Sequence, residues 1–401
     1  MSSARAARRW RWPAGPKSVV MTTRYPLDHP GGVESVARAL VDCLGRSEEG
    51  WRVRHVAAYS GRVGAARIPL LGDLVAAGRL AARIIGKGDI ILVHGAEYAW
   101  GPLAVSRLTR RPVVAVWHGV RASEAIPPAK RRLGRAVRQF FLWSESLLLR
   151  TALQADATVA VSPAVATEMR SLYGIRGELK VIPNGGSMGT PRRTRRPDDD
   201  VRSAGSSNGF PLRAIWVGTC AYKKGLDLAV EACKVARARG QDISLTVVGI
   251  PVESAGLGPA SGASWLTWLG TVPPGEIDAL YRRHDILLFP SRYEACPMAV
   301  LEALAAGLPV IGSSVVQWII EGAGEVVSGE DAGAYAEALR ALAEPERRHR
   351  LSSAALKRAR AFSWESSAAG YLEVLDVVER QRRRRHRHNS RQRAFSSSEA
   401  D

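Results

Sequence analysis

Short apolar runs alternate with longer segments of helical periodicity along most of the chain. Nearly every position within a run is apolar, whereas a strand with one wet face would alternate apolar and polar residues. Uninterrupted runs of this kind are typical of parallel strands that are covered on both faces. In the first half of the chain the predicted strands are residues 18–23, 53–59, 89–95, 112–119, 157–162 and 179–185.

The same alternation resumes after residue 211. Repeated strand-helix alternation predicts an α/β protein with two Rossmann-like, doubly wound parallel-sheet domains, and a length of 401 residues suits two such domains. Residues 187–210 separate the two series and are rich in Gly, Pro, Ser and charge, so we interpret them as a linker. The predicted strands of the second series are residues 212–219, 244–250, 265–270, 285–291 and 308–314.

The net charge of +19 is concentrated at the two ends of the chain. Residues 1–17 carry five Lys/Arg and no acid, and residues 380–393 carry eight Arg and no acid, so thirteen of the nineteen excess charges lie there. We interpret 1–17 as a basic arm and 381–401 as a basic disordered tail. An anionic membrane surface is a candidate partner for both, and no nucleic acid is expected. Residues 130–143 combine cations with aromatics, which fits a membrane-facing helix or an ordinary packed one.

Several features limit the compartment and the chemistry. No apolar run approaches the roughly 20 residues of a membrane-spanning helix, and the N-terminus lacks the apolar segment of a secretion signal. The cysteines show no CxxC pair and no metal-type spacing, and Asp198–Asp200 fits a solvated loop. We therefore expect a cytoplasmic protein, which could also bind peripherally to the inner face of the plasma membrane. We expect it to use neither a metal nor a cofactor.

Open parallel sheets bind ligands at the carboxyl ends of their strands, and polar motifs follow several predicted strands. Gly31 and Gly32 precede a helix predicted from about Val33, where backbone amides suit a phosphate. His118 follows the fourth strand. Each signal alone has an ordinary structural explanation, because glycine turns before helices and single histidines are common in folded proteins.

The second half adds lysines and carboxylates at strand ends. Lys223 and Lys224 lie in a turn before a helix and suit a diphosphate or simply solvent. Glu294 and Glu302 are separated by seven mostly apolar residues, in a predicted strand-turn-helix segment with Pro297 at the first helical position. A buried carboxylate needs a partner, so we expect both to face a wet cleft and to accept hydrogen bonds from sugar hydroxyls.

Taken in order, these motifs resemble the retaining GT-B glycosyltransferases of family 4, also called group 1. The likeness extends over nearly all of the predicted folded part, and it implies a last helix that crosses back to the first domain. The implied domains are an acceptor domain at 18–186, a nucleotide-sugar donor domain at 211–361 and the crossing helix at 362–380. The matching segments are HPGGVE (29–34), WHG (117–119), VAVSPAV (159–165), VIPNG (181–185), KKGLD (223–227), YEACPMAVLEALAAGLPVI (293–311) and FSWE (362–365).

The resemblance implies a role for each matched residue. Glu302 would hold the ribose hydroxyls, Glu294 the transferred sugar and Lys224 the diphosphate. Gly31 and Gly32 would offer amides to the phosphates, and His118 would lie beside the donor sugar. The nucleotide-sugar, a UDP- or GDP-sugar, is a substrate and not a cofactor, and the developing charge would be stabilised without a metal.

Three positions depart from the family pattern. Thr219 stands where many relatives have an arginine, so Lys223 would have to supply the second cation. Pro297 has no N–H to offer, so contacts to the sugar would fall to Met298 and Ala299. Residues 313–327 are shorter and less glycine-rich than usual, which bears on recognition of the base.

The expected acceptor is a glycan or a lipid-linked precursor in cell-envelope or exported polysaccharide synthesis. Arginines in the predicted acceptor loops suit a phosphate-bearing acceptor. The alternatives are a catalytically inactive GT-B scaffold and a basic polyanion-binding protein. A sugar-nucleotide epimerase shares the architecture without the motif order, and the chain is short for a glycogen or starch synthase. The acceptor-loop arginines are Arg62, Arg67, Arg121, Arg131 and Arg132.

Overall fold

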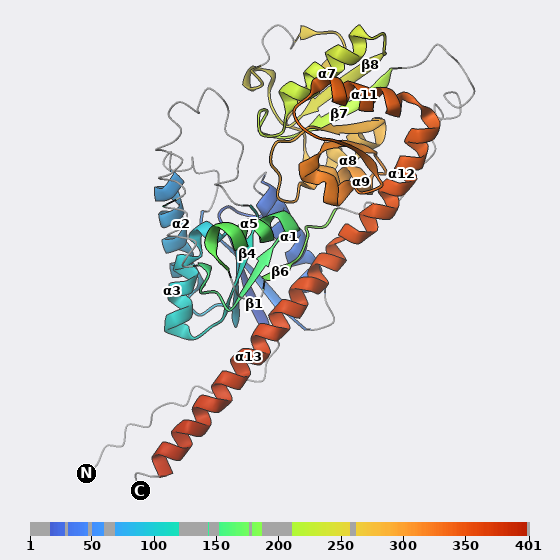
Figure 1. Ribbon diagram of the computed structural model, residues 1–401. Helices are drawn as coiled ribbons and strands as arrows, with labels where there is room; N and C mark the ends of the chain where they lie inside the picture. Colours follow the sequence, from blue (N-terminus) through green and yellow to red (C-terminus); the bar gives the residue numbers. More distant parts are fainter. Residues whose placement is uncertain are drawn as a thin grey trace.

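The protein consists of two six-stranded parallel sheets flanked by helices (Figure 1). This arrangement confirms the expected α/β architecture with two doubly wound domains. The predicted linker, the N-terminal arm before Lys17 and the five acceptor-loop arginines lie outside the described residues. The computed structural model describes residues 17–28, 31–46, 50–59, 69–119, 143, 152–175, 179–186, 211–256 and 262–398.

The first sheet has the strand order β2-β1-β3-β4-β5-β6, so the order reverses between β1 and β3. Every residue of β3 and β4 is buried, which explains why their sequences are apolar without alternation. All six strands correspond to predicted ones. The elements are β1 (Ser18–Thr23), α1 (Gly32–Gly45), β2 (Arg52–Ala57), α2 (Pro69–Ile84), β3 (Ile90–His94), η1 (Ala96–Tyr98), α3 (Trp100–Thr109), β4 (Val113–Trp117), β5 (Ala157–Ala160), α5 (Pro163–Tyr173) and β6 (Leu179–Val181).

The second sheet has the order β12-β11-β10-β7-β8-β9, with its reversal between β7 and β10. Five strands match the predicted runs, and the edge strand β12 is additional because only two of its four residues are apolar. The elements are β7 (Leu212–Val217), α7 (Leu226–Ala238), β8 (Ile243–Val248), η4 (Val252–Ser254), β9 (Leu266–Gly270), α8 (Pro274–Arg283), β10 (Ile286–Phe289), α9 (Met298–Ala305), β11 (Val310–Ser313), η6 (Ser314–Val316), α10 (Gln317–Ile320), β12 (Gly324–Val327), α11 (Ala332–Ala343), α12 (Pro345–Ala359) and η7 (Arg360–Phe362).

A long helix, α13 (Trp364–Ser398), leaves the second domain and runs along the first, where it packs on α1 (Figure 1). Its start is tied to the end of the first domain, since Gly186 N donates to Phe362 O at 2.7 Å and Ser367 Oγ donates to Pro183 O at 2.6 Å. The crossing helix was expected to end at residue 380 and to give way to a disordered tail. That expectation is wrong, because the helix continues to Ser398.

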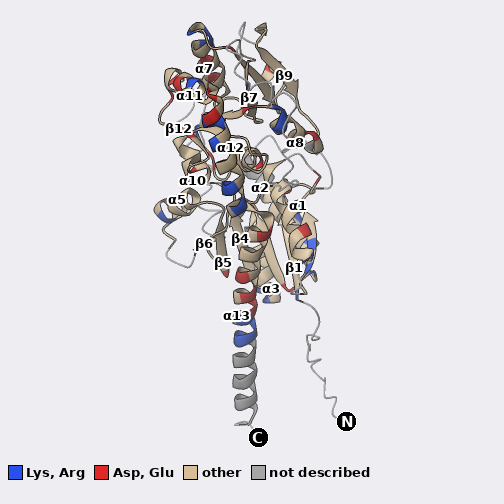
Figure 2. Cartoon of the chain, turned by 90° about the vertical axis from the view of Figure 1, so that its right-hand side faces the viewer, with Lys and Arg blue, Asp and Glu red and all other residues tan. Residues whose placement is uncertain are grey.

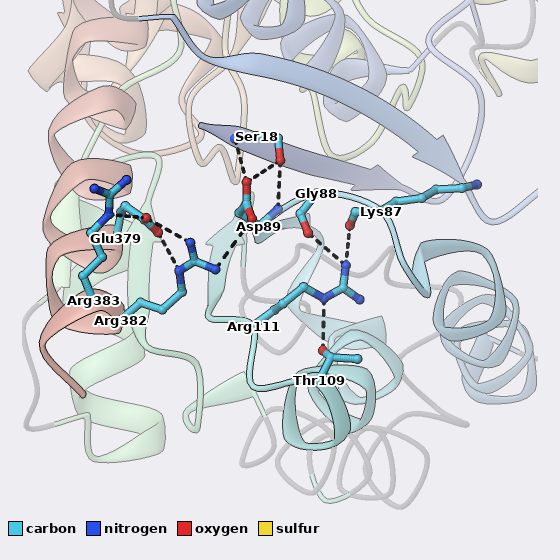
Figure 3. Close-up of polar contacts among 9 residues, drawn as sticks. All are labelled: Ser18, Lys87, Gly88, Asp89, Thr109, Arg111, Glu379, Arg382 and Arg383. Carbon is cyan, nitrogen blue, oxygen red and sulfur yellow. Dashed lines mark hydrogen bonds and ion pairs between the residues drawn. The ribbon is translucent and has the colours of Figure 1, made fainter. Parts of the chain in front are cut away.

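Ion pairs between α13 and the first domain explain part of this difference (Figure 3). Glu379 is 4% exposed and accepts hydrogen bonds from Arg382 and Arg383. Arg382 also lies 3.6 Å from Asp89, whose carboxylate accepts a hydrogen bond from Ser18. In Figure 2 the acidic positions of α13 lie beside the first domain and basic positions follow them toward the C-terminus. Arg382 and Arg383 are therefore paired with acids of the folded protein.

Within the described part of the chain, no helix is long and apolar enough to cross a membrane.

Candidate active site

The loops after β7 and β10 meet where the strand order of the second sheet reverses, which is the usual ligand site of an open parallel sheet. The first loop carries Lys223 and Lys224, and the second carries Glu294. Gly225 has φ +67°, and a Cβ there would lie 1.9 Å from Pro290 O. Only glycine allows the two loops to approach so closely.

Lys224 and Glu294 form an ion pair with Nζ 2.6 Å from Oε1. Ser291 Oγ donates to the same carboxylate oxygen at 2.9 Å. The Glu294 side chain is only 7% exposed, and in this structure its carboxylate contacts Lys224 and Ser291. Its expected contact with a sugar stays a prediction. Its buried charge is balanced by Lys224 and needs no ligand to be stable in the fold. Lys223 lies beside this pair, with Nζ 5.2 Å from the centroid of the Tyr293 ring.

Arg292 joins the two loops and was not singled out from the sequence. Its guanidinium donates to both carboxylate oxygens of Asp227, at 2.8 and 2.7 Å, to Glu330 at 2.9 Å and to Tyr222 O at 2.6 Å. Burial alone would lower the pKa of Arg292, but its hydrogen bonds to Asp227 and Glu330 outweigh burial and raise it. Arg292 N also donates to Lys223 O at 2.9 Å, so this residue fixes the lysine loop from both main chain and side chain.

Glu302 lies on the second turn of α9, as expected, with its side chain partly exposed. Tyr281 Oη donates to Glu302 Oε2 at 3.2 Å. Burial raises the pKa of Glu302 to about 7, although the Tyr281 hydrogen bond opposes this shift. The carboxylate therefore titrates near neutrality.

The helix that carries Glu302 begins one residue later than predicted. Pro297 is its N-cap and Met298 its first residue, because the Pro297 carbonyl accepts the first bonds, from Val300 N and Leu301 N. The backbone amides of Met298 and Ala299 lie before the first hydrogen bond within the helix, so the helix itself offers them no acceptor. Met298 is partly exposed and Ala299 is buried.

The first domain supplies the remaining predicted residues. Gly31 is the N-cap of α1 and Gly32 its first residue, so the predicted glycine turn and helix start are both present. His118 follows β4 and has a partner that we did not predict, since its Nε2 lies 2.9 Å from Nδ1 of His94 at the end of β3. Burial lowers the pKa of His118 to about 4. Thr219 is exposed in the loop after β7.

Contacts between the domains bring His118 and the Glu294 loop into one region. Tyr293 Oη donates to Glu168 of α5 at 3.3 Å, and a Cβ on Gly119 would lie 3.5 Å from the same hydroxyl. Asn184 Nδ2 donates to Cys296 O at 3.2 Å. Gly31 and Gly32, in contrast, make no hydrogen bond to another predicted site residue in the described part of the chain.

Among the described residues, no group of three or more His, Cys, Asp or Glu side chains is arranged to hold a metal ion. The chemical groups at the β7–β10 junction are instead cations, carboxylates and helix amides. Cations and amides are suited to a phosphate, and carboxylates to hydroxyls.

Two Rossmann-like domains, joined by a helix that crosses back from the second to the first, form the GT-B fold. The chain belongs to the group 1, or family 4, glycosyltransferases. The description "Glycosyltransferase Family 4" applies to residues 30–186, and "Glycosyl transferases group 1" to residues 211–345.

Individual relatives agree with this assignment. A D-inositol 3-phosphate glycosyltransferase of Nocardia farcinica is 31% identical over 55% of this chain and 52% of its own length. A glycogen synthase of Mycobacterium tuberculosis is 26% identical over 73% of this chain and 70% of its own. The chain thus spans about half of the first relative's length and about two thirds of the second's.

Solved structures show the same fold. Sucrose-phosphate synthase from Thermosynechococcus elongatus has a TM-score of 0.71 at 20% identity, covering 91% of this chain and 100% of its own. Anabaena HepE in complex with UDP-glucose has a TM-score of 0.66 at 16% identity, covering 90% and 99%. At these identities the likeness concerns the fold.

Proposed function

We propose that this protein transfers a sugar from a UDP- or GDP-sugar to a glycan or lipid-linked acceptor, with retention of configuration. The observation that carries the proposal is the Lys224–Glu294 ion pair at the β7–β10 junction. It places a cation suited to a diphosphate in contact with a carboxylate suited to sugar hydroxyls. The binding of UDP-glucose by HepE supports a nucleotide-sugar donor.

The proposed roles follow the chemistry of each group. Lys224 holds the diphosphate while it keeps contact with Glu294, because an ammonium has three donors. Lys223 supplies the second cation that Thr219 cannot. Glu302 accepts hydrogen bonds from the ribose hydroxyls, and Glu294 binds the transferred sugar.

Backbone amides complete the proposed phosphate site. Gly31 and Gly32 contribute from the start of α1, and Met298 and Ala299 contribute from the start of α9. Together with the lysines, they stabilise the charge that develops on the leaving diphosphate, and we propose that no metal or cofactor takes part. Retention follows if the acceptor hydroxyl attacks from the face that the phosphate leaves and passes its proton to a phosphate oxygen.

We place this reaction in the cytoplasm, in the synthesis of cell-envelope or exported polysaccharide. Four cysteines without disulfide bonds support a reducing compartment. A further part of the proposal is that the cationic ends of the chain bring the enzyme to an anionic membrane surface, where a lipid-linked acceptor would be embedded.

Thermal unfolding in the presence of UDP-, GDP- and ADP-sugars tests the donor. A donor at one hundred times its Kd adds about 2.7 kcal/mol to the free energy of unfolding, which is a shift of several degrees in Tm. Lys224→Ala should lose the shift, whereas Arg340→Met, at an exposed arginine of α11, should keep it. If no nucleotide-sugar raises Tm or is turned over, the inactive-scaffold alternative replaces the enzyme.

A further inference from the structure

His94 and His118 form a hydrogen-bonded pair at the carboxyl ends of β3 and β4. The His94 side chain is fully buried, and the two ring centroids lie 5.2 Å apart. Burial lowers the pKa of both histidines, so both rings are neutral at pH 7. A neutral imidazole has one N–H and one bare nitrogen, so this bond decides where each ring carries its proton.

The main chain of His94 is firmly held. The Tyr98 hydroxyl donates to His94 O, and Gly95 N donates to Val116 O at 3.2 Å. Gly95 has φ +119°, a conformation that only glycine adopts readily, and it allows the chain to turn from β3 into η1. These bonds hold the main chain that carries the His94 ring beside His118.

The surroundings of His94 favour one of the two proton arrangements. His94 Nε2 is buried and has no hydrogen-bond partner among the described residues. A buried N–H without an acceptor is rarer in proteins than an unused acceptor, so Nε2 is the bare nitrogen and Nδ1 carries the proton.

We propose that His94 is a positioning residue that fixes the tautomer of His118. His94 Nδ1–H donates to His118 Nε2, so the proton of His118 is on Nδ1. His118 then offers a hydrogen-bond donor to a hydroxyl of the transferred sugar and does not act as a general base. This inference rests on the proposed function for the placing of His118 beside the donor sugar.

The tautomer is measurable without turnover. In protein labelled with ¹⁵N-histidine, the ring nitrogen shifts distinguish Nδ1–H from Nε2–H, and loss of a spin system in His118→Gln assigns His118. We expect His118 to show Nδ1–H between pH 6 and 8, with and without a nucleotide-sugar. An Nε2–H tautomer for His118 would overturn the proposal, whatever the donor screen gives.

Matched substitutions at His94 then test the consequence. An asparagine side chain at this position would keep an N–H near the place of Nδ1, so His94→Asn should hold kcat within about threefold. His94→Leu fills similar volume without a donor and should lower kcat about tenfold or more. The donor KM should change little in either variant.

Equal losses of kcat in both variants would contradict a tautomer role and indicate packing alone. If the wild-type protein turns over no nucleotide-sugar, the proposed function is wrong. The ¹⁵N measurement still decides separately whether His94 fixes the tautomer of His118.

Discussion

Glu294 and Glu302 show how one segment gives two carboxylates different chemistry. Glu294 is buried against Lys224, which compensates its charge. Among the described residues, Glu302 accepts its side-chain hydrogen bond from the Tyr281 hydroxyl, and burial raises the pKa of Glu302 to about 7. The first carboxylate therefore lies in contact with a cation, whereas the second changes its charge near neutral pH.

Separate contacts predict separate kinetic effects. We expect Glu302→Ala to weaken nucleotide binding, because it removes the acceptor for the ribose hydroxyls. Glu294→Ala should mainly lower turnover, because it removes a contact to the transferred sugar and leaves the Lys224 charge uncompensated. Measuring Kd for the free nucleoside diphosphate and kcat for transfer in each variant distinguishes the two effects. Equal changes in both quantities for both variants would contradict distinct roles.

The raised pKa of Glu302 predicts a pH-dependent affinity for the donor. The carboxylate binds hydroxyls best when ionised, so nucleotide affinity should rise as pH increases through about 7. Tyr281→Phe removes the hydrogen bond that opposes the shift, so the midpoint should move to higher pH. Calorimetric Kd values between pH 5.5 and 8.5 measure this.

Glu302→Gln is the control, and its affinity should not vary with pH in this range. A wild-type affinity that stays constant from pH 5.5 to 8.5 would show that Glu302 does not titrate there. The same titration affects folding with the opposite sign. The native state binds the extra proton between the unfolded pKa and about 7, so the contribution of Glu302 to stability falls as pH rises through that window.

At the scale of elements, the strands of both sheets except β12 could be predicted from the sequence, but the contacts between loops could not. Parallel strands buried on both faces produce apolar runs that are visible locally, whereas β12 is too short and too polar for such a signal. The roles of Arg292 and His94 depend on hydrogen-bond partners that lie far along the chain or at the end of a neighbouring strand. No local pattern distinguishes them from other loop or strand-end residues.

Arg292 gives a prediction at this scale, because it joins the loops after β7 and β10. Arg292→Lys keeps a charge but cannot reach Asp227, Glu330 and Tyr222 O together. We expect a loss of about 1–3 kcal/mol in the free energy of unfolding and a fall in kcat/KM for the donor.

A double-mutant cycle with Lys224→Ala tests whether Arg292 acts through the lysine loop. If it does, Lys224→Ala should cost less kcat/KM in the Arg292→Lys background than in the wild type. Arg340→Met is the matched control, since its exposed pair with Glu337 should contribute little. Strictly additive losses would restrict Arg292 to a role in stability.

At the scale of the whole molecule, α13 connects the two domains and includes most of the basic segment that was predicted to be a disordered tail. Composition alone predicted disorder after residue 380, because a run of arginines cannot bury an apolar face. Besides Glu379 on the same helix, two acids that pair with this run lie elsewhere in the fold: Asp89, 3.6 Å from Arg382, and Asp156, 3.1 Å from Arg385. These pairs reduce the positive charge that is available to a membrane. Membrane binding is therefore best tested at the cations beyond Arg385.

The membrane proposal predicts that removing residues 386–401 weakens binding to anionic vesicles while the folded body stays intact. The truncation deletes Arg387, Arg391 and Arg393 but keeps the pairs of Arg382 and Arg385. Each cation near an anionic surface contributes about 1 kcal/mol, and the attraction is screened within about 8 Å at physiological salt. The full chain should therefore sediment with phosphatidylserine-containing vesicles at low salt, dissociate as salt rises, and ignore neutral vesicles.

Activity gives a second measure of the same prediction. Loss of residues 386–401 should lower transfer to a membrane-embedded acceptor far more than transfer to a soluble analogue, because only the first depends on time spent at the surface. An unchanged Tm would show that the truncation spares the fold. If the truncated protein binds anionic vesicles as well as the full chain does, the C-terminal cations have no docking role. Deletion of residues 1–16 would then test whether the N-terminal arm carries the attraction instead.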